Sequence, residues 1–120
     1  MKKILLIEAD LALQDYLVLR LSSKQVRVLT TASERAGLKL ARAEQPDLII
    51  CGLNLPQLNG LNVLKAIRTD PTLKDLAFLL LSHRSSRTFF DRAESLRATG
   101  YIEKTQLWKQ LPQQVSACLA

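Results

Sequence analysis

The chain has 120 residues and a formal net charge of +6, a length that predicts one domain over residues 1–120 built around a single core. With 48% hydrophobic residues and only four glycines and four prolines, the composition excludes a disordered chain. No apolar run approaches the roughly 20 residues that cross a bilayer, and the two cysteines suggest neither a disulfide framework nor a metal site. We therefore expect a cytoplasmic protein without a membrane span.

The positive charge alone does not indicate a nucleic-acid partner. The 17 Lys and Arg residues are spread along the whole chain, and the densest stretch is interleaved with Asp91 and Glu94. This interleaving is typical of a solvated helix face. The arginines of that stretch are Arg84, Arg87, Arg92 and Arg97. We rank nucleic-acid binding well below the functions considered next.

Strands and helices alternate along the chain. An apolar strand at residues 3–7 is followed by a helix that Asp10 is expected to cap, with apolar residues at helical spacing up to Leu21. The later elements, strand and helix in turn, are expected at residues 25–29, 33–44, 47–51, 60–69, 76–81, 86–98, 100–103 and 107–119. Five such units predict an α/β fold, a doubly wound parallel sheet with helices on both faces. Continuous apolar strands fit this arrangement, because they are buried on both sides.

Ligands of such open sheets bind beyond the carboxyl ends of the strands. Connectivity places four short segments at that edge: Glu8, Ala9 and Asp10; Gly52; Ser82, His83 and Arg84; and Lys104. Gly52 is the most informative member, because a residue without a side chain supplies neither a nucleophile nor a metal ligand.

These segments resemble the receiver domain of two-component response regulators, over the whole length of the chain. Residues 4–10 look like the opening strand of that family with its acidic pair, and residues 46–56 look like its phospho-acceptor strand and loop. Ser82, Lys104 and Tyr101 fall at the hydroxyl, lysine and switch-aromatic positions. The resemblance implies the flavodoxin-like (βα)5 fold with five parallel strands in the order 2-1-3-4-5.

In a working receiver, an aspartate attacks a phosphoryl donor while Mg²⁺ neutralises the developing charge. By resemblance, Gly52 replaces that aspartate, Ala9 replaces the second acid, and Asn54 stands at the backbone metal contact. We interpret the chain as a pseudo-receiver that is not an enzyme and holds no metal or cofactor. Its degenerate phosphorylation pocket would comprise Glu8, Ala9, Asp10, Gly52, Asn54, Ser82, His83 and Lys104.

Several details of this pocket stay open. Lys104 either pairs with Glu8, which we favour, or attracts an anion. His83 is expected as a half-buried filler, with a pH switch as the alternative. Thr105 stands where the family has proline, so a trans peptide bond is expected before it. Cys51 is expected to be an inert, buried thiol, with a redox-sensitive thiol as the alternative.

The aromatic residues Phe89, Phe90, Tyr101 and Trp108 suggest a contact patch on the face formed by the fourth helix, fifth strand and fifth helix. Adjacent residues of a helix cannot both face the core, so one of Phe89 and Phe90 is expected near the surface. We predict a phosphorylation-independent signalling module that acts through this face on a protein partner. The partner would be a histidine kinase, an output domain, another signalling protein or a second copy. The alternative is a small-molecule or anion sensor that uses the vacated pocket.

Overall fold

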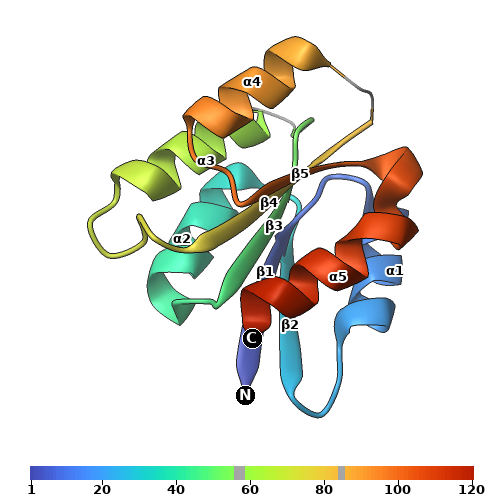
Figure 1. Cartoon of the computed structure of the whole chain (residues 1–120). Coiled ribbons are helices and arrows are strands. Elements are labelled where there is room, and N and C mark those ends of the chain that lie inside the picture. Colours follow the sequence, from blue (N-terminus) through green and yellow to red (C-terminus); the bar gives the residue numbers. More distant parts are fainter. Residues whose placement is uncertain (56–58, 84–85) are drawn as a thin grey trace.

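The fold is a single five-stranded parallel sheet with helices on both faces (Figure 1). The computed structural model describes residues 1–55, 59–83 and 86–120. The strand order is β2-β1-β3-β4-β5, which confirms the predicted α/β fold. Residue 56, the last of the matched range 46–56, and Arg84 lie outside the described residues. The elements are β1 Lys2–Ile7, α1 Leu11–Leu21, β2 Val26–Thr31, α2 Glu34–Glu44, β3 Leu48–Gly52, α3 Gly60–Thr69, β4 Ala77–Ser82, α4 Arg87–Ser95, β5 Gly100–Glu103, the 3₁₀ turn η1 Lys104–Gln106 and α5 Leu107–Leu119.

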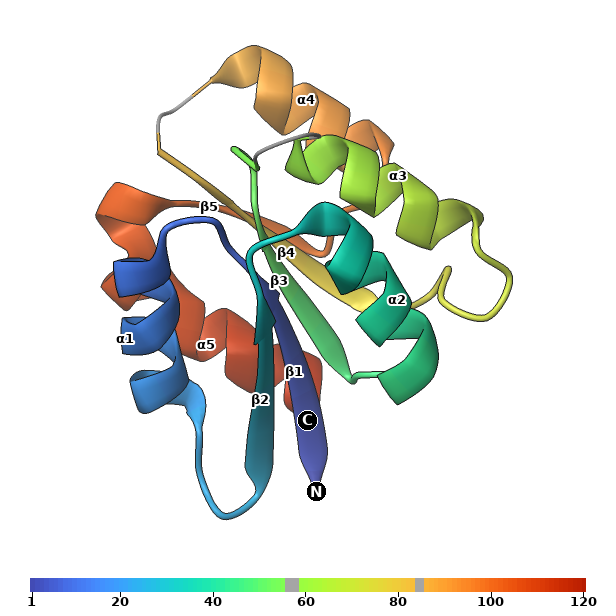
Figure 2. The ribbon, with the colours of Figure 1, turned by 180° about the vertical axis from the view of Figure 1, so that it is seen from behind.

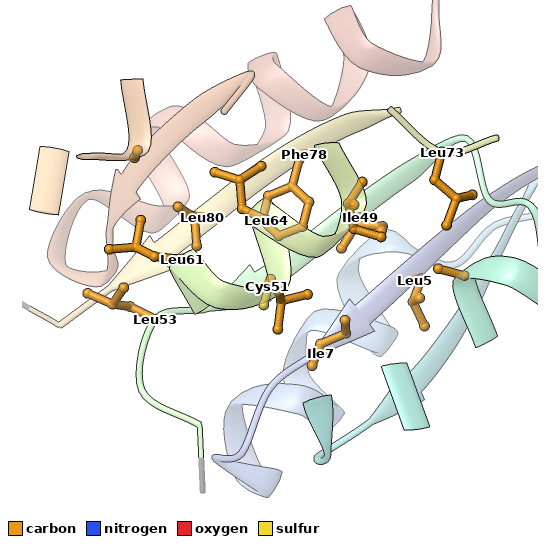
Figure 3. Close-up of a cluster of buried hydrophobic side chains, with 14 residues drawn as sticks. Leu5, Ile7, Ile49, Cys51, Leu53, Leu61, Leu64, Leu73, Phe78 and Leu80 are labelled. Carbon is orange, nitrogen blue, oxygen red and sulfur yellow. The ribbon is translucent and has the colours of Figure 1, made fainter. Parts of the chain in front are cut away.

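The helices divide into two layers because side chains alternate across each strand. Ile4 and Leu6 of β1 pack with residues of α1 and α5 on one face. Leu5 and Ile7 pack on the other face with residues of α2, α3 and α4. The view from behind shows these three helices on one side of the sheet, with α1 and α5 on the other (Figure 2). Figure 3 shows this second cluster, in which Phe78 of β4 lies among the aliphatic side chains. Both faces of the sheet are therefore buried, as the apolar strands predict.

Two boundaries differ from the sequence prediction by more than one residue. β2 extends to Thr31, because it stays paired with β1 up to the register Ile7↔Thr31. α4 ends at Ser95, three residues early, because Arg97 adopts a left-handed conformation with φ 64. The N–H of Ala98 then donates to the carbonyl of Ala93 at 2.9 Å, which closes the helix as a Schellman-type turn.

The peptide bond between Lys104 and Thr105 is trans, as predicted, since no described residue follows a cis bond. The chain turns there through η1 into α5. Among the described residues, no helix has the length and apolar character needed to cross a membrane.

Candidate functional site

The candidate site lies where β1, β3, β4 and β5 end together. In the parallel register, Ile7 pairs with Cys51, Gly52 with Leu81 and Ser82 with Glu103. The residues that directly follow these strands therefore meet at one edge, as connectivity predicts.

A buried ion pair occupies the centre of this edge. The Lys104 ammonium lies 2.9 Å from Glu8 Oε1, and the two side chains are only 14% and 2% exposed. Glu8 Oε1 accepts no aligned hydrogen bond from the described residues, so Lys104 supplies its charge compensation. The favoured prediction, that Lys104 pairs with Glu8, is confirmed. The two charges interact strongly with each other, because neither of them is well solvated.

The second carboxylate oxygen of Glu8 is held by the start of α1. The backbone N–H of Asp10 donates to Glu8 Oε2 at 2.9 Å, and the Gln14 side-chain amide donates to the Glu8 carbonyl at 3.2 Å. Asp10 itself accepts from the N–H of Leu13 at 3.1 Å and caps the helix, as predicted. Its carboxylate is thus engaged with the helix N-terminus, where the helix dipole favours a negative charge.

Gly52 makes room for the Glu8 carboxylate. A Cβ atom placed on Gly52 would lie 2.8 Å from Glu8 Oε1 and 3.3 Å from Glu8 Cδ. The first distance is shorter than a van der Waals contact, so any side chain at Gly52 would have to displace Glu8. The carboxylate of Glu8 therefore lies in the space where a side chain at the end of β3 would begin.

The remaining predicted pocket residues surround this pair at different depths. Ser82 is buried at the end of β4, whereas His83 is exposed, so the expectation of a half-buried filler is wrong. Successive side chains of an extended segment point to opposite sides, and His83 follows the buried Ser82. Its Nε2 atom lies 3.5 Å from the Lys104 ammonium. Ala9 is half-buried, and Asn54 is exposed in an isolated bridge with Asn59.

The oxygen donors of this edge do not fit Mg²⁺. This ion binds to carboxylate oxygens that are not already engaged with other groups of the protein. Glu8 is paired with Lys104, Asp10 caps α1, and Gly52 has no side-chain oxygen. Within the described part of the chain, no three residues among His, Cys, Asp and Glu are grouped to hold a metal ion.

Cys51 lies beneath the pair, fully buried in β3. Burial raises the pKa of its thiol, and the nearby charges of Glu8 and Glu34 raise it further. The thiol therefore stays protonated and weakly nucleophilic, which supports the prediction of an inert cysteine.

The predicted aromatic patch is only partly assembled. Phe90 is 40% exposed and packs edge-on against Tyr101, with ring centroids 5.8 Å apart. Phe89 is half-buried against the core, so the prediction that one of the two phenylalanines lies near the surface is confirmed. The Tyr101 hydroxyl is buried and has no hydrogen-bond partner among the described residues.

Trp108 does not join this patch. Its ring packs edge-on against Tyr16 of α1 at 4.7 Å, and the Arg20 guanidinium lies 5.2 Å from the Trp108 ring centroid. Sequence reasoning missed this second aromatic group, although the spacing of Tyr16 and Arg20 places them on one helix face.

The comparisons agree with this geometry. A family profile described as the response regulator receiver domain matches residues 4–116, and the chain therefore belongs to that family. It is 27% identical over 103 residues to "Probable chemotaxis protein CheY" of Rhizobium etli, covering 85% of this chain and 80% of that protein. It is 42% identical over 86 residues to the transcriptional regulatory protein AfsQ1 of Streptomyces coelicolor, covering 71% of this chain and 36% of that one.

Solved structures show the same fold. The non-phosphorylated HemR receiver domain from Leptospira biflexa superposes with a TM-score of 0.89 at 28% identity, covering 100% of this chain and 95% of that one. The chemotaxis protein CheY4 of Vibrio cholerae gives 0.84 at 26% identity, covering 94% and 98%. The chain thus spans most of the two chemotaxis proteins and of the HemR receiver domain, but only about a third of AfsQ1.

Proposed function

We propose that this receiver domain is a non-phosphorylatable signalling module, and not an enzyme, that acts on a protein partner through its α4–β5–α5 face. The observation that carries the proposal is the Glu8 carboxylate, which fills the space beside Gly52 and pairs with Lys104 at 2.9 Å. Gly52 offers no nucleophile for an acyl phosphate. Glu8 is buried, and its charge is already compensated.

The same pair also supports a fixed interaction face. Lys104 directly follows β5, which carries Tyr101. Because Glu8 already compensates the charge of the Lys104 ammonium, a phosphoryl group is not required as its counter-charge. The domain would then present one arrangement of β5 and α4 constitutively, and its activity would be controlled by binding or abundance. The alternative of a small-molecule or anion sensor in the vacated pocket has less support, because Glu8 and Lys104 compensate each other there.

Treatment with acetyl phosphate and Mg²⁺, followed by intact-mass measurement, tests the loss of phosphorylation. We expect no phosphoryl adduct on the wild type. An adduct that maps to Asp10, Glu8 or any other residue would overturn the proposal.

Restoration variants sharpen this test. Gly52→Asp alone should label poorly, because the new side chain collides with Glu8 and Ala9 still leaves a metal ligand missing. Ala9→Asp combined with Gly52→Asp should label better. Gly52→Ala, which introduces the collision without a carboxylate, is the matched control and should not label. Equal labelling of the single and double variants would show that this account of the metal site is wrong.

A further inference from the structure

A groove runs between α3 and α4, which lie side by side on one face of the sheet (Figure 2). Its volume is about 230 Å³. The lining residues are Leu61, Asn62 and Lys65 of α3, with Arg92, Ser95 and Leu96 from the end of α4 and its cap. On each helix these positions are one turn apart, so the side chains lie on one helix face. The groove shares no residue with the predicted pocket at the strand ends.

The floor of the groove is apolar and its rim is polar. Leu61 is buried and Leu96 is half-buried, and both pack with the core cluster beneath α3 and α4. The rim is formed by four exposed residues, Asn62, Lys65, Arg92 and Ser95. None of their side chains has a hydrogen-bond or ion-pair partner within the described part of the chain. The rim therefore offers hydrogen-bond donors that the fold does not use.

The groove carries two positive charges and no negative one. Lys65 and Arg92 supply the cations, and no Asp or Glu is among the lining residues. The carboxylate of Asp91, which precedes Arg92, is paired with Arg87 at 3.1 Å on the same helix. An anion in the groove would therefore meet two cations without displacing an ion pair of the described chain.

The end of α3 adds to this positive potential. Arg68 lies one turn beyond Lys65, and its guanidinium donates to the carbonyl of Arg97 at 2.8 Å. Burial lowers the pKa of Arg68, and the charge of Arg97 lowers it further, by more than Asp75 raises it. Cations therefore outweigh acids on this side of the molecule, which favours the approach of an anion.

We propose that the α3–α4 groove binds the phosphate group of a small molecule. The Lys65 ammonium and the Arg92 guanidinium balance a dianion, and the planar guanidinium matches two phosphate oxygens at once. Asn62 and Ser95 supply donors for the remaining oxygens. A carboxylate carries one charge and two oxygens, so it would leave part of this rim without a partner.

The floor and the size of the groove restrict the rest of the ligand. Leu61 and Leu96 favour an apolar group next to the phosphate, because contact with them removes apolar surface from water. The volume of about 230 Å³ lies below the roughly 300 Å³ at which pockets for drug-sized molecules begin. The ligand is therefore a small organic phosphate.

Titration of the ¹⁵N-labelled domain at constant ionic strength tests the proposal. The probes are phenyl phosphate, phenyl sulfate and inorganic phosphate, at about pH 7.5, where a phosphate monoester is mostly a dianion because its second pKa is about 6. Phenyl sulfate keeps the shape but carries one negative charge.

We expect phenyl phosphate to give saturable amide shifts around Lys65 and Arg92. Phenyl sulfate should bind about tenfold more weakly, as for the loss of one hydrogen bond between charged groups. Inorganic phosphate should also bind more weakly than phenyl phosphate, because it does not contact the leucines of the floor.

Variants locate the effect. Lys65→Gln and Arg92→Gln should each weaken the binding of phenyl phosphate about tenfold. Lys109→Gln makes the same change of charge at an exposed residue of α5, on the other face of the sheet, and should leave the affinity unchanged. Because all three replaced side chains are exposed, the spectra of the unliganded variants should differ from the wild type only near the substitution.

Four results would overturn the inference: equal affinity for phenyl sulfate, unchanged affinity in Lys65→Gln and Arg92→Gln, shifts that map elsewhere, or no saturable shifts. Inorganic phosphate that binds as tightly as phenyl phosphate would overturn the organic part and make the free ion the occupant. The mass measurement with acetyl phosphate detects a covalent adduct and not this reversible binding. The site and the proposed function can therefore fail separately.

Discussion

Glu103 and Lys104 are consecutive residues, yet they belong to regions of opposite character. Lys104 points into the pocket at the strand ends, where its charge is compensated by Glu8 at 2.9 Å. Glu103 lines a hollow beside β5, the strand at the edge of the sheet, where its charge has no partner among the described residues. The difference follows from solvation: a buried charge must be compensated within the fold, whereas a charge near solvent can remain available for another molecule. The pocket at the strand ends thus holds a compensated pair, whereas the hollow beside β5 is lined by a carboxylate without an ion-pair partner among the described residues.

The largest expected effect comes from breaking the pocket pair. Glu8→Gln leaves the Lys104 ammonium buried without a counter-charge, and we expect the free energy of unfolding to fall by about 3 kcal/mol. Urea denaturation of both proteins measures the change.

Removing the orphaned charge is the control for this variant. Glu8→Gln combined with Lys104→Met should recover at least half of the loss, because the uncompensated ammonium is then absent. A loss below about 1 kcal/mol in the single variant would mean that solvent already screens Lys104, as in a surface pair, and the contrast with the β5 edge would not hold.

A smaller effect is expected at Gly52. None of the glycines has a positive φ, so an alanine there is compatible with the backbone and the penalty is steric. Gly52→Ala should lower the free energy of unfolding by about 2 kcal/mol through overpacking against Glu8.

A double-mutant cycle with Glu8→Ala checks the cause of that loss. Shortening Glu8 removes the atoms that the new methyl group meets, so the effect of Gly52→Ala should largely disappear in the Glu8→Ala background. Additive effects of the two changes would show that Gly52 is constrained by something other than Glu8.

The pH dependence of stability reports on the Cys51 thiol of β3, which is buried in the core. The pKa of the Cys51 thiol is raised in the folded chain by burial and by Glu8 and Glu34, while an unfolded cysteine ionises near about pH 8.5. Above that pH the unfolded chain releases a proton that the folded chain retains. Stability is therefore unaffected below this value and falls as the pH rises above it, by about 1.4 kcal/mol per pH unit for one group.

Urea denaturation between about pH 8.5 and 9.5 measures this slope. Cys51→Ala should lose most of it, whereas Cys118→Ala, which changes a partly exposed thiol near the end of α5, should keep most of it. An unchanged slope in Cys51→Ala would mean that the thiol is not sealed within the fold.

The alternation of apolar strands with helices was sufficient for the α/β class and for the residues at the strand ends, whereas the strand order followed from the resemblance to the receiver family. The sequence also predicted that Lys104 pairs with Glu8 and that Asp10 caps α1, since both follow from connectivity and local chemistry. It did not show that Glu8 occupies the space beside Gly52, which depends on the distance between two strands. It misplaced Trp108, because the rotation of α5 about its axis decides whether that ring meets Tyr101 or Tyr16.

The smallest effect on stability is expected at the β5 edge. Glu103→Gln makes the same chemical change as Glu8→Gln, on the chain neighbour of Lys104. Because Glu103 has no ion-pair partner among the described residues, the free energy of unfolding should change by less than about 0.5 kcal/mol, measured in the same urea series. A loss above about 1 kcal/mol would mean that the fold itself uses this carboxylate. If stability is unchanged, the fold does not depend on the charge of Glu103, which is the reverse of the role of Glu8.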